Sequence, residues 1–292
     1  MLERRGRGVM KLLDKREYRS VVQKIRAVDI NTMFALSVLE RKVDGYVFVD
    51  ETESSSSIYV QHPYGMSLLY GISENEEFNI KFLTHMLNSK KTRSRFEWLQ
   101  AYPAAAHSRI AELLGKRLKK KNPDLPYDQT FSQSEENDVL EYRRINFVFN
   151  DEKYRLLRRS LKSDEYRIVT TSKSIFEKME GTVIPRHFWN NGKDFFRNGT
   201  GCSLILENGS SAATAFAAFV IGNKFEIGVE TNKDFHGRGF ATLTCSALID
   251  HSLANRYEPV WSCLSGNTGS VKLALKLGFE EKRRVPYYRL AK

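Results

Sequence analysis

The stretch from Phe225 to Thr242 constrains the fold more than any other part of this chain. It reads F-E-I-G-V-E-T-N-K-D-F-H-G-R-G-F-A-T, which predicts an apolar strand, a short polar bend and the start of a helix. Glycine lets the backbone turn tightly with several N–H groups pointing the same way, here at Gly237 and Gly239. A helix start adds unpaired N–H donors and the positive end of a dipole. This corner is therefore suited to bind a pyrophosphate.

The elements after this corner make the pattern more specific. A strand is predicted over 259–264, followed by S-G-N-T-G-S and an amphipathic helix that ends in Leu277-Gly278-Phe279. The order glycine corner, helix, strand, asparagine, helix and L-G-F resembles the GNAT family of acyl-CoA-dependent N-acetyltransferases. With E-I-G-V-E-T before the loop, the chain is most similar to the two-part group that includes zwittermicin-resistance-type acetyltransferases. The resemblance covers the C-terminal half closely and the rest loosely.

A chain of 292 residues is long for one domain and sufficient for two. The resemblance implies an α/β (α+β) protein with a C-terminal GNAT fold, in which a central mixed sheet is splayed. A smaller GNAT-like α/β domain is expected before it. The polar run that follows Asn122 has no apolar periodicity and is predicted to be a linker. The predicted domains are therefore residues 1–122 and 139–292, joined by 123–138.

The order of elements in the first half is predicted to repeat in the second. Three pairs of residues share a spacing of 163 positions: Trp98 and Trp261, Leu114 and Leu277, and Gly115 and Gly278. The first-half corner, 71–77, is acidic and lacks G-x-G, and its three carboxylates would repel a pyrophosphate. We expect a first domain that does not bind coenzyme. The alternative is two unrelated α/β units with a few chance matches.

Three further elements are predicted from apolar spacing. A helix should carry Ile80, Leu83 and Leu87 on one face. Another, over 104–118, would place the basic run 116–121 at its end, where cations favour the helix dipole. A helix over 188–196 is expected to arch over the substrate side, as in GNAT-like folds.

Acyl transfer to an amine needs a base, because an amine with a pKa of about 10 arrives mostly as ammonium. Glu226 lies ten residues before His236, and the resemblance to histone-acetylating GNAT proteins implies that it is this base, directly or through water. Side-chain alternation places Glu230 on the same face of the strand, as a second candidate. The alternative is that both are half-exposed strand residues in salt bridges.

The resemblance also implies the coenzyme site. The backbone from Val229 to Thr231 would pair with the pantetheine arm like an added strand, and one strand N–H would stabilise the oxyanion. His236 stands where the family usually has Arg or Gln. Asn267 and Ser270 either contact the coenzyme or cap the last helix, and capping is preferred for Ser270. The implied coenzyme-binding residues are Val229, Glu230, Thr231, His236, Gly237, Arg238, Gly239, Phe240, Ala241, Thr242, Asn267 and Ser270.

One residue of the family pattern is absent. Many GNAT proteins place a tyrosine, the general acid for the leaving thiolate, where this chain has Ala274. Tyr287 or Tyr288 could serve instead, or coenzyme A could leave as thiolate and take a proton from water. An acyl-cysteine route through Cys263 is not favoured, because a buried cysteine is usually a small apolar residue.

Composition bears on location and partners. Three cysteines without C-x-x-C spacing indicate a reducing compartment, and we expect a cytoplasmic protein. No apolar run approaches the roughly 20 residues that cross a bilayer. The net charge of +11 is spread widely, so it favours an anionic cosubstrate or a solvated surface over a nucleic-acid partner. No metal is expected, and the oligomeric state is open.

The sequence thus predicts an acetyl-CoA-dependent N-acetyltransferase. It would move the acetyl group to a primary amine of a small molecule or peptide, by direct attack in a ternary complex. One alternative is a FemABX-like transferase that uses aminoacyl-tRNA, although such enzymes typically lack a pyrophosphate loop. The other is a regulatory protein that binds acyl-CoA without turnover, as Ala274 and His236 would allow.

Overall fold

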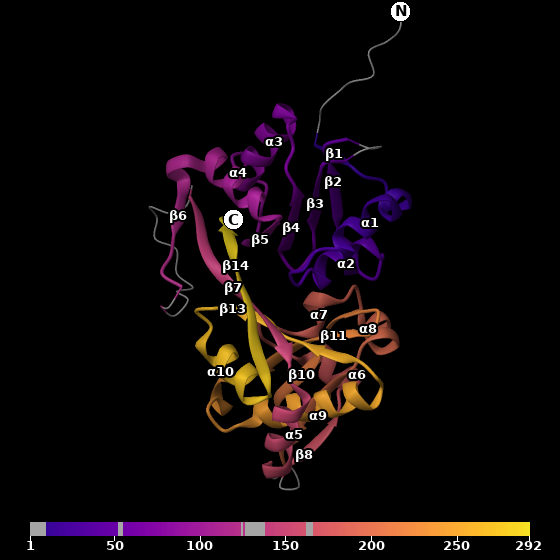
Figure 1. Ribbon diagram of the computed structural model, residues 1–292. Coiled ribbons are helices and arrows are strands. Elements are labelled where there is room, and N and C mark those ends of the chain that lie inside the picture. The colour runs from indigo at the N-terminus through magenta and orange to yellow at the C-terminus, as the bar shows by residue number, and fades with distance from the viewer. Residues whose placement is uncertain (1–9, 52–54, 124, 126–137, 162–165) are drawn as a thin grey trace, which may run out of the picture. The chain divides into compact units, whose positions relative to one another are not determined.

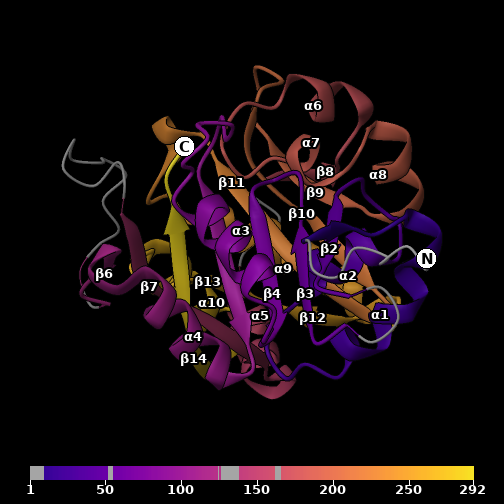
Figure 2. The same cartoon turned by 90° about the horizontal axis from the view of Figure 1, so that it is seen from above.

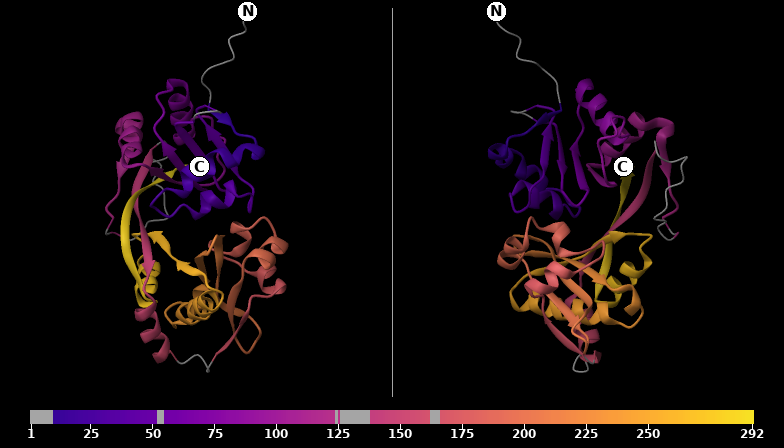
Figure 3. Two further views of the ribbon diagram at one scale, coloured as in Figure 1. Left: turned by 45° about the vertical axis from the view of Figure 1, so that its right-hand side comes forward. Right: turned by 180° about the vertical axis from the view of Figure 1, so that it is seen from behind.

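The computed structural model describes residues 10–51, 55–123, 125, 138–161 and 166–292. Contacts divide the chain into two units: Met1–Arg144, Leu264–Gly266 and Arg284–Lys292 form unit 1, and Ile145–Cys263 and Asn267–Arg283 form unit 2. Strands β7 (Val139–Phe149) and β14 (Phe279–Leu290) are neighbours in one sheet and contribute residues to both units (Figure 3). The predicted linker, 123–138, lies almost entirely outside the described residues. Within the described ranges, every helix is too short or too polar to cross a membrane.

Unit 1 is built on a mixed sheet whose described strands follow the order β1-β2-β3-β4-β5-β14. Neighbouring strands are antiparallel except β4 and β5, which are parallel. Phe78, Phe82, Leu99 and Ile110 form part of its buried core. Its elements (Figure 1) are β1 (Lys11–Leu12), η1 (Lys15–Glu17), α1 (Tyr18–Arg26), α2 (Met33–Leu39), β2 (Tyr46–Val49), β3 (Ser57–Gln61), β4 (Met66–Gly71), α3 (Glu76–Met86), β5 (Glu97–Tyr102), α4 (Ala104–Leu114), η2 (Gly115–Arg117) and β6 (Leu118–Lys120).

Two predictions for unit 1 were wrong in detail. Helix α3 buries Phe78 and Phe82, and Leu83 and Leu87 pack partly buried against the same core as predicted. Ile80 alone of the predicted face is exposed, at 62%, because the aromatic i, i+4 pair takes the centre of the core. The helix that precedes the basic run 116–121 ends earlier than the predicted residue 118. Helix α4 ends at Leu114, where Gly115 takes a positive φ of 50°, and the run continues into η2 and β6.

Unit 2 contains a second sheet, whose described strands follow the order β12-β11-β10-β9-β8. Its pairs are antiparallel except β11 and β12, which are parallel. Helices α6, α7 and α8 gather beside β8, β9 and β10 (Figure 2). The further elements are α5 (Asp151–Ser160), β8 (Arg167–Thr170), α6 (Lys173–Lys178), α7 (Pro185–Phe188), α8 (Gly192–Asn198), β9 (Gly201–Ile205), β10 (Ser211–Ile221), β11 (Lys224–Thr231), η4 (Lys233–Phe235), α9 (Phe240–Ala254), β12 (Glu258–Val260), β13 (Ser262–Leu264) and α10 (Thr268–Lys276).

The predicted helix over 188–196 is divided. Helix α7 ends at Phe188, and Asn191 then caps a new helix by accepting a hydrogen bond from the Asp194 N–H at 2.9 Å. The predicted strand over 259–264 is also divided, at Trp261. Its first part, β12, pairs with β11, and its second part, β13, is a neighbour of β7.

The predicted fold class is confirmed, and the element order repeats. Unit 1 runs β2-β3-β4-α3-β5-α4, and unit 2 runs β9-β10-β11-α9-β12-β13-α10. In each series the first three strands are antiparallel and the strand after the helix is parallel to the strand before it. Trp98 lies in β5, and Trp261, which follows it by 163 positions, lies between β12 and β13.

Candidate active site

The second half of strand β11 has an open edge. β12 pairs with β11 only from Lys224 to Glu226, whereas β10 pairs with β11 as far as Thr231. The Asn232 N–H donates to the Ala212 carbonyl at 3.0 Å, which makes that pair the hydrogen-bonded kind. Because the two kinds of pair alternate, the main-chain groups of Val229 and Thr231 point away from β10, toward the open edge. This splay was predicted.

The splay follows from the way Trp261 is held. Its side chain is 2% exposed, its indole N–H donates to the Ser270 hydroxyl at 3.2 Å, and its ring packs on Phe279. Its carbonyl accepts from the Phe147 N–H of β7 at 3.1 Å. These contacts turn the strand from β11 toward β7 after Val260. The break itself was not predicted, because the apolar pattern of 259–264 is that of one continuous strand.

The loop after β11 presents unbonded amides at the start of α9. Gly237 and Gly239 have φ values of +78° and +80°, and a Cβ added at either would meet nothing within 4 Å. Gly239 is the N-cap of α9, and no side chain caps this helix. Among the hydrogen bonds of the described residues, none is donated by the main-chain N–H groups from Gly237 to Thr242. The corner therefore has space and donors for an anion.

Glu226 is a buried residue near the start of β11. It is 4% exposed and is therefore not the half-exposed residue of the alternative interpretation. By strand alternation it shares a face of β11 with Gly228 and Glu230. That face turns toward α7, because a Cβ on Gly228 would lie 2.6 Å from the Phe216 ring, which itself packs on Phe188. The two predicted carboxylates are thus on one face, four residues apart, but in different surroundings.

Glu230 is half-buried, and its carboxylate is already engaged. Oε2 accepts from the N–H groups of Thr182 at 3.0 Å and Val183 at 2.7 Å, in the connection between α6 and α7. The sequence analysis did not anticipate this contact between residues 47 and 48 positions apart. Gly181, where an added Cβ would meet the Glu230 side chain, was the one residue in the sequence that could have indicated this close approach.

The remaining loop residues divide by role. The His236 Nε2 donates to the Thr231 carbonyl at 3.0 Å, so the imidazole links the loop to the end of β11 by a hydrogen bond. Arg238 is exposed and stacks on Phe235, with its guanidinium carbon 5.3 Å from the ring centre. Phe240 and Thr242 are buried, so only their main chain can face the corner.

Asn267, and not Ser270, caps the last helix. The Asn267 Oδ1 accepts from the Ser270 N–H at 3.1 Å, while the Ser270 hydroxyl accepts from Trp261. The preference for Ser270 as the cap was therefore wrong, because its position three residues into the motif places its N–H, not its side chain, at the cap. Both residues lie at the start of α10, after β13.

The family tyrosine position is closed to solvent. Ala274 is fully buried. The two replacements that the sequence offered belong to unit 1, where Tyr287 stacks on Trp98 at 4.8 Å and the Tyr288 hydroxyl contacts His107 Nδ1 at 2.9 Å. Burial raises the pKa of Tyr288. No group of three or more metal-ligating side chains is found in the described ranges.

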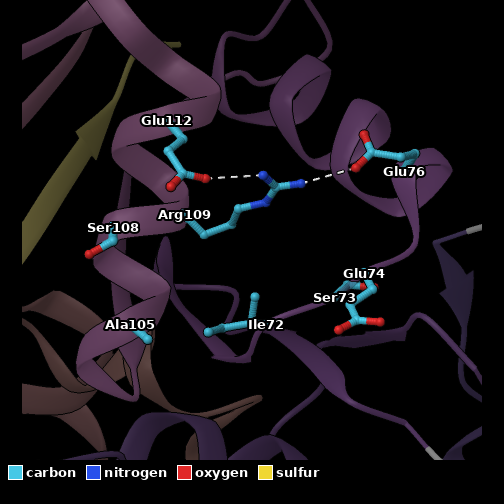
Figure 4. A pocket seen from close by; sticks show the side chains of 8 residues that line it. All are labelled: Ile72, Ser73, Glu74, Glu76, Ala105, Ser108, Arg109 and Glu112. Atoms are coloured by element: carbon cyan, nitrogen blue, oxygen red, sulfur yellow. Dashed lines mark hydrogen bonds and ion pairs between the residues drawn. The ribbon is translucent and has the colours of Figure 1, made fainter.

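The corresponding corner of unit 1 is built differently. β5 pairs with β4 from Met66 to Tyr70, so β4 has no open edge like that of β11. The Asn75 side chain accepts from the N–H groups of Glu77 and Phe78, at 3.0 and 3.2 Å, and so occupies the donors at the start of α3. Nearby, Arg109 bridges Glu76 and Glu112 (Figure 4).

Comparison with known proteins agrees with this geometry. The uncharacterized N-acetyltransferase YdfB of Bacillus subtilis (strain 168) is 19% identical over 248 residues, which cover 85% of this chain and 86% of that protein. The fold is similar to the crystal structure of a GCN5-related N-acetyltransferase-like protein from Streptococcus suis 89/1591, with a TM-score of 0.66, 19% identity and coverage of 94% and 98% of the two chains. It is also similar to a tandem GNAT protein from the clavulanic acid biosynthesis pathway, with a TM-score of 0.58, 10% identity and 97% coverage of each. The family model described as GNAT acetyltransferase matches residues 27–288. The chain belongs to the GNAT acetyltransferase family.

Proposed function

We propose that this protein transfers an acetyl group from acetyl-CoA to a primary amine of a small molecule or peptide. The observation that carries the proposal is the run of main-chain amides from Gly237 to Thr242, which is free of partners among the described residues. It stands at the end of a strand that pairs with no described neighbouring strand on this edge beyond Glu226, and the Thr231 carbonyl there accepts from His236. Phosphates fit the first feature, and an extended pantetheine arm fits the second.

The chemistry assigned to unit 2 needs one base and one oxyanion donor. Glu226 takes a proton from the ammonium form of the acceptor, directly or through water, and releases the nitrogen lone pair. The nitrogen attacks the thioester carbonyl, and the Val229 N–H stabilises the negative charge that develops on its oxygen. The C–N bond forms, the C–S bond breaks, and the nitrogen gives its second surplus proton to water. Coenzyme A leaves as thiolate and takes a proton from water, because Ala274 offers no acid.

Titration calorimetry with acetyl-CoA tests the proposal. We expect wild type to bind and Gly239→Trp not to bind, because the new side chain enters the space beside the free amides. Gly209→Trp is the matched control: Gly209 also has a φ of +80° and empty space within 4 Å of an added Cβ, but lies in the turn between β9 and β10. Equal affinity of wild type and Gly239→Trp, or equal loss in both variants, would remove the coenzyme from this corner.

The acceptor is to be sought in a panel of spermidine, L-lysine, an aminoglycoside and a lysine-containing peptide, with free thiol release as the readout. We assign the coenzyme and its chemistry to residues 139–292, and a GNAT-like domain that binds no coenzyme to 1–122, with 123–138 between them. The Asn75 cap and the continuous β4–β5 pairing support the second assignment.

We also propose membership in the two-part zwittermicin-resistance-type group, supported by the repeated element order. A cytoplasmic location is supported by Cys202, Cys245 and Cys263, which all have free thiols.

A second candidate function is acyl-CoA sensing without turnover. The buried Ala274 at the position of the family acid favours it. The two candidates separate when wild type binds acetyl-CoA: thiol release with any amine of the panel supports the enzyme, and binding without release supports the sensor. A FemABX-like transferase would not bind acetyl-CoA at all.

A further inference from the structure

The connection between α6 and α7, residues 179–184, is bound by two side chains of α7. The Arg186 guanidinium donates to the carbonyls of Phe176, at 2.6 Å, and of Glu177 and Met179, and so caps the C-terminal end of α6. The His187 Nδ1 donates to the Thr182 carbonyl at 3.1 Å. The Met179 and Thr182 carbonyls are thus bound by side chains of α7, while the N–H groups of Thr182 and Val183 are bound by another element.

That other element is β11. The Glu230 Oε2 accepts from both the Thr182 and Val183 N–H groups, at 3.0 and 2.7 Å. Hydrogen bonds to an ionised carboxylate are about twice as strong as neutral ones, and a pair converging on one oxygen also sets the direction of the backbone. Glu230 therefore determines where the connection lies against the strand.

Gly181 allows this close approach. Its φ of +137° is available to glycine and rarely to other residues, and an added Cβ would lie 2.6 Å from the Glu230 Cδ and 2.7 Å from Oε2. A side chain at 181 would therefore push the carboxylate and the backbone apart. The carboxylate, the two amides and the bare Cα form one contact, which we name the 181–230 latch.

We infer that Glu230 is a positioning residue, and that the latch makes residues 180–183 a wall of the acceptor amine site. Glu230 lies between Val229 and Thr231, whose main-chain groups face the open edge, and shares its face with Glu226. A backbone segment fixed to Glu230 is consequently within one side-chain length of the place where the thioester is to be attacked. The inference rests on the proposed function and refines it, because it assigns Glu230 to the acceptor and not to proton transfer.

Three variants test the latch: Glu230→Ala removes both hydrogen bonds, Glu230→Gln keeps an oxygen that can accept them, and Gly181→Ala disrupts the contact from the other side with Glu230 intact. Gly209→Ala controls for an alanine at positive φ. In Glu230→Ala and Gly181→Ala we expect the KM for the most active amine of the panel to rise about tenfold. The affinity for acetyl-CoA should stay within about twofold in all four variants. Glu230→Gln should retain a KM within about threefold of wild type.

A second readout follows the contact itself. Amide hydrogen exchange at Thr182 and Val183 should become faster by about tenfold or more in Glu230→Ala and Gly181→Ala, but not in Gly209→Ala. If kcat collapses equally in Glu230→Gln and Glu230→Ala while Gly181→Ala keeps it, Glu230 is a base and the inference is wrong. If Glu230→Ala still binds acetyl-CoA and its KM for the amine is unchanged, this inference is wrong but the proposed function stands. Failure of wild type to bind acetyl-CoA overturns the proposed function and the acceptor wall together.

Discussion

Replacing Gly278 by alanine should destabilise unit 2 more than its backbone conformation alone requires. Gly278 has a φ of +84° and follows α10, and its carbonyl accepts from the Asn150 N–H at 2.9 Å. A Cβ at this position would lie 2.7 Å from the Tyr154 N and 2.9 Å from the Asn150 carbonyl oxygen, both in the first turn of α5. Helix α5 cannot simply retreat, because the Tyr154 hydroxyl contacts Asp250 of α9 at 2.6 Å.

The cost of this substitution has three parts. The positive φ costs an alanine about 1 kcal/mol, and overpacking against main-chain atoms costs roughly 1–3 kcal/mol. Weakening the hydrogen bond from Asn150 adds about 1 kcal/mol. The sum is roughly 3–5 kcal/mol, which for a domain of this size lowers the melting temperature by roughly 10 °C. Gly209→Ala carries only the first part, because nothing lies within 4 Å of its added Cβ.

Thermal unfolding followed by circular dichroism measures the difference between the two variants. We expect Gly278→Ala to melt several degrees below Gly209→Ala, which should itself stay within roughly 3 °C of wild type. Equal melting temperatures would show that the first turn of α5 yields to the new methyl group. Steric contact would then not be the reason for glycine in the L-G-F motif.

Two predictions remain, besides those given for the coenzyme corner and the latch. Glu226→Gln should leave acetyl-CoA affinity within about twofold and lower kcat by about 10²-fold or more, and unchanged turnover would remove Glu226 as the base. Burial lowers the pKa of His62 to about 3, so the folded protein leaves it neutral while the unfolded chain protonates it below about 6.5. The free energy of unfolding should therefore decrease as the pH is lowered from about 6.5 to 3, and this residue contributes up to about 1.4 kcal/mol per pH unit to the decrease. The free energy of unfolding, measured with urea at several pH values, should depend less steeply on pH in His62→Gln than in wild type. An equal dependence on pH in both proteins would contradict the cause given.

Local patterns in the sequence predicted the parts of the site that lie along one stretch of chain. Alternation in 225–231 predicted β11, and two glycines predicted the turn with positive φ before α9. The same approach wrongly placed Ile80 on the buried side of α3, because the apolar residues of that helix can be assigned to two faces. Phe78 and Phe82 take the core since their rings are larger and stack at 6.1 Å.

Contacts between distant segments could not be predicted. The Glu230 carboxylate binds amides that precede it by 47 and 48 residues, and main-chain donors carry no sequence signature. Tyr287 and Tyr288 were considered as acids because of their residue type. They instead group with unit 1, since the end of β14 pairs with β5 at Leu99. The spacing of residues along the chain predicts neither the Glu230 contact nor the pairing of β14 with β5.

The two units differ in the contacts of Trp98 and Trp261, the pair that is separated by 163 positions. Trp98 stays inside β5, and the pairing with β4 continues for four residues beyond it, to Tyr102. Trp261 does not pair with β11, because it contacts Ser270, Phe279 and Phe147 instead. The edge of β11 beyond Glu226 is therefore left without a neighbouring strand among those that the structure describes. The open edge is therefore a consequence of side-chain packing behind the strand and not of the glycine loop in front of it. It follows that the free amides of the loop and the open edge have separate causes in this fold, and that among the described residues only those of unit 2 combine both.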